Sequence, residues 1–196
     1  MVEALNPRTK RVREALIQAA REAVAEHSVN EISLTQIAES AQVSRPTIYK
    51  QFNDTASLVA EATIQLMEEV FADIDEELSD DEHESVEYLG RLMDLFIQRV
   101  YQERRFCRNA MHGSSAASIS MYVVNMLDER MARGLVGKRL APSGRFAADY
   151  RRVLSAGVVW LLVEWLDSDF KDDNAPECFS RRLTSVLVEF SMAGSH

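Results

Sequence analysis

Residues 32–52 read ISLTQIAESAQVSRPTIYKQF. The first half of this stretch has the pattern of a helix start. Ser33 and Gln36 have the spacing of a capping box, in which each side chain hydrogen-bonds to the backbone of the other residue. The pattern predicts a short helix from Leu34 to about Ala41, with Ile37 and Ala38 facing inward.

A second helix is predicted within the same stretch. Ser44 is a favourable N-cap, and Pro46 lies in the first turn, where a missing backbone N–H costs little. The helix is predicted over Arg45–Phe52, with Ile48 on its inward face. Two helices of these lengths joined by a short turn have the spacing of a helix-turn-helix, whose second helix suits the major groove of DNA.

The rest of the chain is also predicted to be helical. Helix breakers are scarce, with seven Gly and four Pro in 196 residues. Apolar residues recur at three- and four-residue spacing over 9–26, 54–78, 86–100, 105–111, 119–135, 147–167 and from 176 onward. We therefore expect an all-α fold of about nine helices, with a DNA-binding domain at 1–53 and a larger domain at 54–196. The clearest break in the second half is LAPSGRF, residues 140–146.

Charge is unevenly distributed along the chain. The net charge of -9 argues against a polyanionic partner if it is spread evenly, because like charges repel. Residues 1–53, however, hold seven basic and six acidic residues, a net charge of +1, which leaves -10 on the remainder. Between Asp73 and Glu87 lie nine acidic residues and no basic one. This segment is predicted to be a solvated helix end and loop rather than a cation site.

The sequence offers no motif for catalysis or metal binding. It contains no phosphate-binding glycine loop, GxSxG or HExxH pattern, and its four histidines show no ligand spacing. We therefore expect no enzyme activity, cofactor or metal. Cys107 has arginines at 104, 105 and 108, which would favour a reactive thiolate and a redox sensor. A small buried core residue is the alternative.

The cellular compartment is predicted from two features that the sequence lacks, an export signal and a membrane-spanning segment. Two cysteines without an export signal fit free thiols in a reducing compartment. The longest apolar run, residues 158–163, is far shorter than a membrane span. A cytoplasmic protein is expected.

At residues 32–52, preceded by REALIQAAREAVAEH at 13–27, the sequence resembles the TetR family of one-component transcriptional regulators. The resemblance covers about residues 9–62 and continues in the helix count and in WLLVEWL at 160–166. It implies a homodimer that binds a palindromic double-stranded operator and is released by a small apolar or amphipathic effector. Repression is the family's usual mode, and activation stays open. The alternative is a ligand-binding or scaffold dimer of the same fold that has lost DNA binding.

The resemblance also implies site residues. The positions that the family uses at the operator are Thr35, Arg45, Pro46, Thr47, Tyr49, Lys50 and Gln51. We assign Tyr49 and Thr35 to phosphates, Thr47 and Pro46 to apolar contacts with base edges, and the remaining three to bases or phosphates. For Tyr49, the alternative is a partly buried aromatic residue that closes a helical core.

Two further sets are expected in the larger domain. The candidate effector pocket comprises Met67, Phe71, Phe96, Tyr122, Asn125 and Trp160, for which ordinary core packing is the alternative. The candidate dimer interface, on the last two helices, comprises Trp160, Leu161, Glu164, Trp165, Leu183, Leu187 and Phe190.

Two residues depart from the family pattern. Gln42 occupies the turn position where the family usually has Gly, so a positive φ there would cost on the order of 1 kcal/mol. Thr55 stands where the family usually has a phosphate-binding Lys. We hypothesise that a basic N-terminal tail compensates on DNA, through Arg8, Lys10, Arg11 and Arg13.

Overall fold

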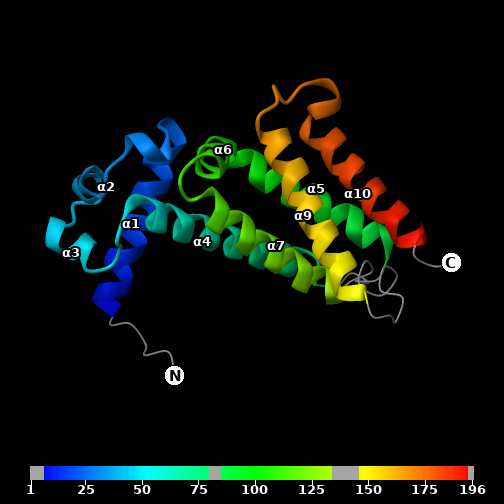
Figure 1. The fold of residues 1–196 in the computed structure, drawn as a ribbon, viewed down its shortest axis with the longest axis horizontal. Coiled ribbons are helices and arrows are strands. Elements are labelled where there is room, and N and C mark those ends of the chain that lie inside the picture. Colours follow the sequence, from blue (N-terminus) through cyan, green and yellow to red (C-terminus); the bar gives the residue numbers. More distant parts are fainter. Residues whose placement is uncertain (1–6, 80–84, 134–145, 194–196) are drawn as a thin grey trace. The chain divides into compact units, whose positions relative to one another are not determined.

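The computed structural model describes residues 7–79, 85–133 and 146–193, all of which belong to helices or their connections. No β-strand occurs in these ranges, so the predicted all-α fold is confirmed. Nine α-helices lie in the same ranges (Figure 1). In chain order they are α1 (Pro7–Glu26), α2 (Leu34–Ser40), α3 (Arg45–Tyr49), α4 (Thr55–Glu77), α5 (Val86–Gln102), α6 (Arg104–His112), α7 (Ala116–Arg133), α9 (Ala147–Leu166) and α10 (Pro176–Ala193).

Two 3-10 helices were not predicted. They are η1 (Val29–Glu31), which follows α1, and η2 (Asp172–Asn174), which precedes α10. In η1 the backbone N–H of Ser28 donates to the Glu31 carboxylate at 3.2 Å, which closes a capping box. A three-residue segment carries no apolar period, and so the sequence predicts only a turn at these places.

Contacts divide the chain into two compact units. The first consists of Met1–Leu66 and Glu103–Ile119, and the second of Met67–Gln102 and Ser120–His196. The sequence of the first unit carries ten basic and nine acidic residues, a net charge of +1, which leaves -10 on the second. The functional boundary expected at residue 53 stays a prediction.

In the first unit, α1 packs against α2 and α6, and α2 packs against α3. The residues that fill this core were predicted by their helical spacing. Leu16 and Ala20 of α1, Ile37 of α2 and Ile48 of α3 have no exposed surface. Gly113, at the end of α6, lies so close to η1 that an added Cβ would be 2.6 Å from the Cβ of Val29. Glycine is therefore required for this approach.

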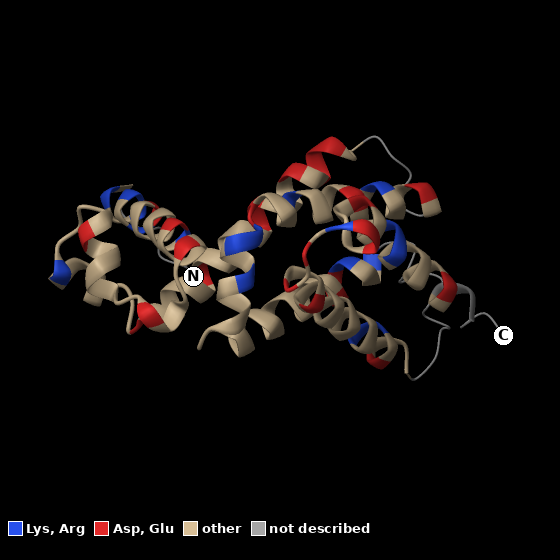
Figure 2. Ribbon diagram, turned by 90° about the horizontal axis from the view of Figure 1, so that it is seen from above, with Lys and Arg blue, Asp and Glu red and all other residues tan. Residues whose placement is uncertain are grey.

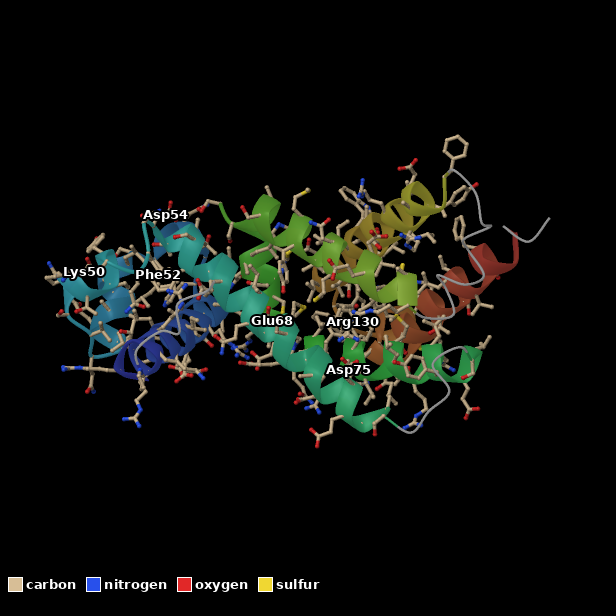
Figure 3. The ribbon with its side chains drawn as sticks, turned by 90° about the horizontal axis from the view of Figure 1, so that it is seen from below. Lys50, Phe52, Asp54, Glu68, Asp75 and Arg130 are labelled. Carbon is tan, nitrogen blue, oxygen red and sulfur yellow. The ribbon has the colours of Figure 1, made fainter. Side chains whose placement is uncertain are left out.

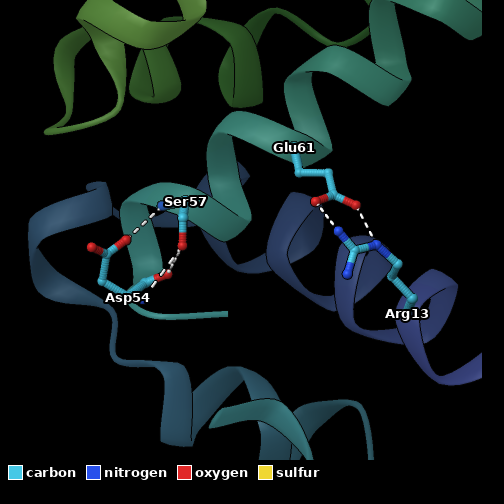
Figure 4. A network of polar contacts seen from close by, with 4 residues as sticks. All are labelled: Arg13, Asp54, Ser57 and Glu61. Carbon is cyan, nitrogen blue, oxygen red and sulfur yellow. Dashed lines mark hydrogen bonds and ion pairs between the residues drawn. The ribbon is translucent and has the colours of Figure 1, made fainter. Parts of the chain in front are cut away.

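Polar side chains cap two of the three helices that surround the turn. The Ser33 hydroxyl accepts from the Gln36 N–H at 3.3 Å, and the Gln36 side chain accepts from the Ser33 N–H at 2.9 Å, which confirms the predicted capping box. Asp54 Oδ1 accepts from the Ser57 N–H at 2.7 Å and caps α4 (Figure 4). Ser44 is the N-cap residue of α3, but its hydroxyl makes no capping bond to the backbone.

In the second unit, α10 packs mainly against α5 and also contacts α9 and η2. Its aromatic core centres on Trp165, which is 1% exposed. The Trp165 ring stacks on Phe179 with centroids 4.8 Å apart, and its indole N–H donates to the Asn174 carbonyl at 2.8 Å. These contacts hold the connection between α9 and α10 against the helices.

Some predictions fall on segments outside the described residues. These are 140–145 of the predicted break, 80–84 of the predicted acidic loop, and the end of the helix predicted over 119–135. Within the described ranges, α3 ends at Tyr49 rather than Phe52, although the Phe52 N–H still donates to the Ile48 carbonyl at 2.9 Å.

No helix of the described ranges has the length and apolar content needed to cross a lipid bilayer.

Candidate nucleic-acid interface

The helix-turn-helix is closed by a turn with a left-handed residue. Gln42 has φ 55°, which is the positive φ at which strain was expected. The turn brings the Val43 N–H to the Ala38 carbonyl at 2.8 Å. This bond caps the end of α2 and sets the direction in which α3 begins. A left-handed conformation is costly for a residue with a Cβ, and the turn is therefore strained.

The predicted operator residues lie at or near the surface of the first unit. Four of them are exposed: Arg45, Pro46, Tyr49 and Lys50. Thr35, Thr47 and Gln51 are half-buried. Tyr49 is 56% exposed, which excludes the alternative that it closes the core. Figure 3 shows Lys50 pointing outward, whereas Phe52 points into the unit, where it is 4% exposed.

Polar contacts tie several of these side chains to their neighbours. The Arg45 guanidinium donates to the Glu39 carboxylate at 2.8 Å, which links α3 back to α2. The hydroxyls of Ser44 and Thr47 lie 2.7 Å apart. Gln51 Oε1 is buried and has no hydrogen-bond partner among the described residues. To contact DNA, Arg45 and Thr47 must exchange these hydrogen bonds for bonds to bases or phosphates.

Thr55 has a structural role that the sequence did not indicate. Its hydroxyl donates to the Ile32 carbonyl at 3.1 Å and joins the start of α4 to the segment before α2. A lysine at this position would lack that short bond. The departure from the family pattern therefore exchanges a cationic side chain for a bond within the unit.

Arg13 is engaged inside the first unit. Its guanidinium donates through Nε and Nη2 to the two carboxylate oxygens of Glu61 (Figure 4). The same group lies over the ring of Phe52, 4.8 Å from the centroid. Arg13, one of the four residues of the hypothesised basic tail, thus holds α1 against α4 and against Phe52, just after α3. Lys10 and Arg11 are exposed.

Cys107 is buried in α6, with 4% of its surface exposed. Burial raises the pKa of its thiol from 9.0 to about 12, and the Glu103 carboxylate adds to the effect. The arginine that lowers this pKa is Arg21 of α1. The structure thus favours the core alternative over the redox sensor, because a thiol of this kind is protonated at neutral pH.

The expected pocket residues fall into two groups in the second unit. Met67, Phe71 and Phe96 are buried, and the rings of Phe71 and Phe96 stack with centroids 5.2 Å apart. Tyr122 is half-buried, whereas Asn125 and Trp160 are exposed. The assignment of these residues to an effector pocket stays a prediction.

Polar residues beside this aromatic pair were missed from the sequence. The Arg130 guanidinium lies 4.0 Å from the centroid of Phe71 and donates to both carboxylate oxygens of Asp75 at 2.8 and 2.7 Å (Figure 3). Tyr122 donates to Glu68 at 3.0 Å, and both burial and this carboxylate raise the pKa of Tyr122. These pairs join α4 to α7 across more than 50 positions of sequence, a separation that helical periodicity cannot bridge.

The expected interface residues also divide by burial. Trp165, Leu183 and Leu187 are each 1% exposed and belong to the core of the second unit. Leu161 is half-buried, and Glu164 is exposed. Trp160 is 74% exposed and Phe190 is 49% exposed. An intersubunit contact on this face must therefore use the exposed residues rather than the buried three.

Both signs of charge are present on the first unit, and acidic residues predominate on the second (Figure 2). A nearly neutral unit can approach a polyanion at far lower electrostatic cost than a unit with a net charge of -10. DNA contact through the first unit is thus compatible with the acidity of the chain.

Comparison with known proteins identifies the same segment. Residues 16–62 match the family model described as bacterial regulatory proteins, tetR family. These residues span most of α1, all of α2 and α3, and the start of α4. No relative among curated proteins matches the chain.

Solved structures share the fold over nearly the whole chain. The fatty acid degradation regulator FadR from Bacillus halodurans is 18% identical, with a TM-score of 0.65 over 95% of this chain and 97% of that one. The TetR family repressor AlkX from Dietzia sp. strain DQ12-45-1b is 15% identical, with a TM-score of 0.65 and coverages of 99% and 100%. NalD of Pseudomonas aeruginosa is 22% identical, with a TM-score of 0.58 and coverages of 92% and 96%.

Proposed function

Because residues 16–62 match the model of the TetR family of bacterial regulatory proteins, we propose that the protein binds a palindromic operator as a homodimer and represses transcription. A small apolar or amphipathic effector releases it from DNA. The protein acts in the cytoplasm, where it meets the chromosome, and has no catalytic role.

The exposed surface of α3 is the observation that carries this proposal. Ile48 anchors the helix in the core with no exposed surface, so the opposite face is free to enter a groove. That face presents the guanidinium of Arg45, the phenol of Tyr49 and the ammonium of Lys50. These groups can hydrogen-bond to guanine edges and to phosphates.

Dimerisation is supported by an apolar stripe on α9. Exposed Phe146, Tyr150, Val153 and Trp160 follow one another at helical spacing, with Gly157 between the last two. Val153 is 71% exposed. A contiguous apolar stripe of this kind on a water-soluble surface is typical of a protein interface. A two-fold partner on this face gives two α3 helices, which must lie about 34 to 36 Å apart, or a multiple of that distance, to enter successive major grooves.

The effector class follows from the aromatic pair and its polar neighbours. Phe71 and Phe96 form a buried, stacked apolar pair, and Arg130 over the Phe71 ring is a cation that a carboxylate or phenolate ligand could share with Asp75. The structural relatives are named for fatty acid degradation, n-alkane biodegradation and a multidrug efflux pump. Fatty acids and n-alkanes, named for two of these relatives, are amphipathic and apolar molecules, which supports the proposed class for this chain. An effector acts by binding one of two conformations more tightly.

Selection of genomic DNA tests the proposal. The purified protein is mixed with sheared DNA of its source at low and moderate salt, and the retained fragments are sequenced. We expect a small set of fragments that share an inverted repeat, and a Tyr49→Ala variant that does not enrich them. Retention without sequence preference, or no retention, would instead support a ligand-binding dimer that does not read DNA.

A further inference from the structure

The ion pair between Glu39 and Arg45 lies on the face that is proposed to meet DNA. Arg45 is the first residue of α3, and Glu39 is the penultimate residue of α2, so the pair bridges the turn. Arg45 Nη2 lies 2.8 Å from Glu39 Oε1, and both side chains are largely exposed, at 65% and 61%. The carboxylate therefore stands beside a cation that would otherwise be available to a phosphate.

From this geometry we propose that Glu39 is a specificity-determining residue, which holds Arg45 away from DNA phosphates until a correct base replaces the carboxylate. The inference rests on the proposed DNA-binding function. Glu39 itself does not read a base. It acts on Arg45, by competing for the guanidinium, and on DNA, by repelling the phosphate backbone.

The two kinds of DNA offer Arg45 different replacements. Mixed-sequence DNA offers chiefly phosphate oxygens, which give a sequence-independent, salt-dependent attraction. Breaking the ion pair for such a contact exchanges one carboxylate for one phosphate and leaves Glu39 unpaired near the negative backbone. An operator with guanine at the right position offers two acceptors, O6 and N7, to the planar guanidinium. A phosphate is offered by every sequence, whereas the guanine contact exists only where the correct base is present, so only the second exchange depends on sequence.

A second ion pair of the same unit provides a matched control. Arg105 of α6 donates to Glu26 of α1 at 3.1 Å, and the two side chains are 67% and 64% exposed. A Glu26→Gln change thus removes the same charge and frees an arginine of nearly the same exposure. It does so outside α2 and α3, so it leaves the pair on the DNA-facing turn in place.

The test compares Glu39→Gln with Glu26→Gln in the full-length protein. Binding is measured by fluorescence anisotropy with a mixed-sequence duplex of about 30 base pairs, three helical turns, and with a duplex that the wild type selects from genomic DNA. For the mixed duplex we expect Glu39→Gln to bind about two- to fivefold more tightly per subunit, the range typical of an exposed ion pair. The slope of the logarithm of the binding constant against the logarithm of the salt concentration should steepen by about 0.9 for each added phosphate contact. Affinity for the selected duplex should rise less, so selectivity falls.

The alternative outcomes are distinct. Equal effects of Glu39→Gln and Glu26→Gln on the mixed duplex would overturn the inference, because net charge alone would then explain them. An equal gain on both duplexes would also overturn it, because selectivity would be unchanged. If the wild type selects no duplex at all, the proposed function itself fails, which separates that failure from the failure of the Glu39 proposal.

Discussion

Arg13 of α1 holds Glu61 of α4 through two hydrogen bonds and at the same time covers the ring of Phe52 with its guanidinium. The Arg13 and Glu61 side chains are 29% and 32% exposed. One cation thus connects α1, α4 and Phe52, which lies three residues after the end of α3. The orientation of α3 depends on this contact as well as on apolar packing.

A double-mutant cycle measures the strength of that contact. Arg13→Lys loses the planar fork that matches a carboxylate, and Glu61→Gln loses the charge. We expect each change to lower the free energy of unfolding in urea by about 1 kcal/mol, with a coupling of similar size. The pair Lys10–Glu14, at 3.8 Å and 71% and 51% exposed, is the control and should couple by less than about 0.5 kcal/mol. Equal coupling in the two cycles would contradict the proposed role of Arg13.

The left-handed turn predicts an unusual effect of glycine. At Gln42 a Cβ costs about 1 kcal/mol, whereas glycine removes that strain but gains entropy in the unfolded chain. We expect Gln42→Gly to be more stable than Gln42→Ala by about 0.5 to 1 kcal/mol. Thermal unfolding of the two variants checks this, and an alanine variant as stable as the glycine variant would argue against strain at the turn.

The buried thiol predicts selective labelling. Since the pKa of Cys107 is raised to about 12, iodoacetamide at pH 8 should modify it far more slowly in the native protein than after unfolding in urea. The half-buried Cys178 provides the internal comparison, and mass spectrometry distinguishes the two sites. Rapid labelling of Cys107 in the native protein would contradict this and would support the reactive thiol of a redox sensor.

The same group makes stability depend on pH. The folded thiol keeps its proton to a higher pH than the unfolded one, so the folded state binds more protons above pH 9.0. Its contribution to stability is complete below pH 9.0 and is lost as the pH rises toward about 12. Cys107→Ala should flatten the loss of stability over this interval in urea titrations.

The apolar stripe predicts a dimer that one charge can break. Trp160→Glu places a carboxylate in the proposed interface, whereas Met121→Glu places one on α7 at a residue that is also well exposed, 64% against 74%. We expect sedimentation velocity to show monomers for Trp160→Glu and dimers for Met121→Glu. Dimers in both variants would show that α9 does not carry the interface.

Local patterns predicted the fold well because helices are governed by nearby residues. The capping box at Ser33 and the buried spacing of Leu16, Ile37 and Ile48 are all readable within a few positions. For Gln42 the sequence indicated only a condition, that a positive φ would bring strain, and the structure shows that the condition is met. A turn between two short helices has few conformations available.

Contacts between distant segments were not predictable in this way. The engagement of Arg13 with Glu61, and of Arg130 with Asp75 and Phe71, depends on how helices pack after they have formed. Similarly, an all-round apolar segment at 158–166 did not show which side faces the subunit core. The structure buries Trp165 and exposes Trp160, five positions earlier on the same helix.

A footprint on a selected DNA fragment tests most directly whether a dimer reads DNA through paired α3 helices. In the complex with the wild-type protein, hydroxyl radicals cleave the DNA at each sugar that the protein leaves exposed. We predict two protected half-sites related by inverted repeat, with centres about 10 base pairs or a multiple of that apart. A single protected site, or two sites with no helical repeat between them, would contradict the proposed dimeric operator binding.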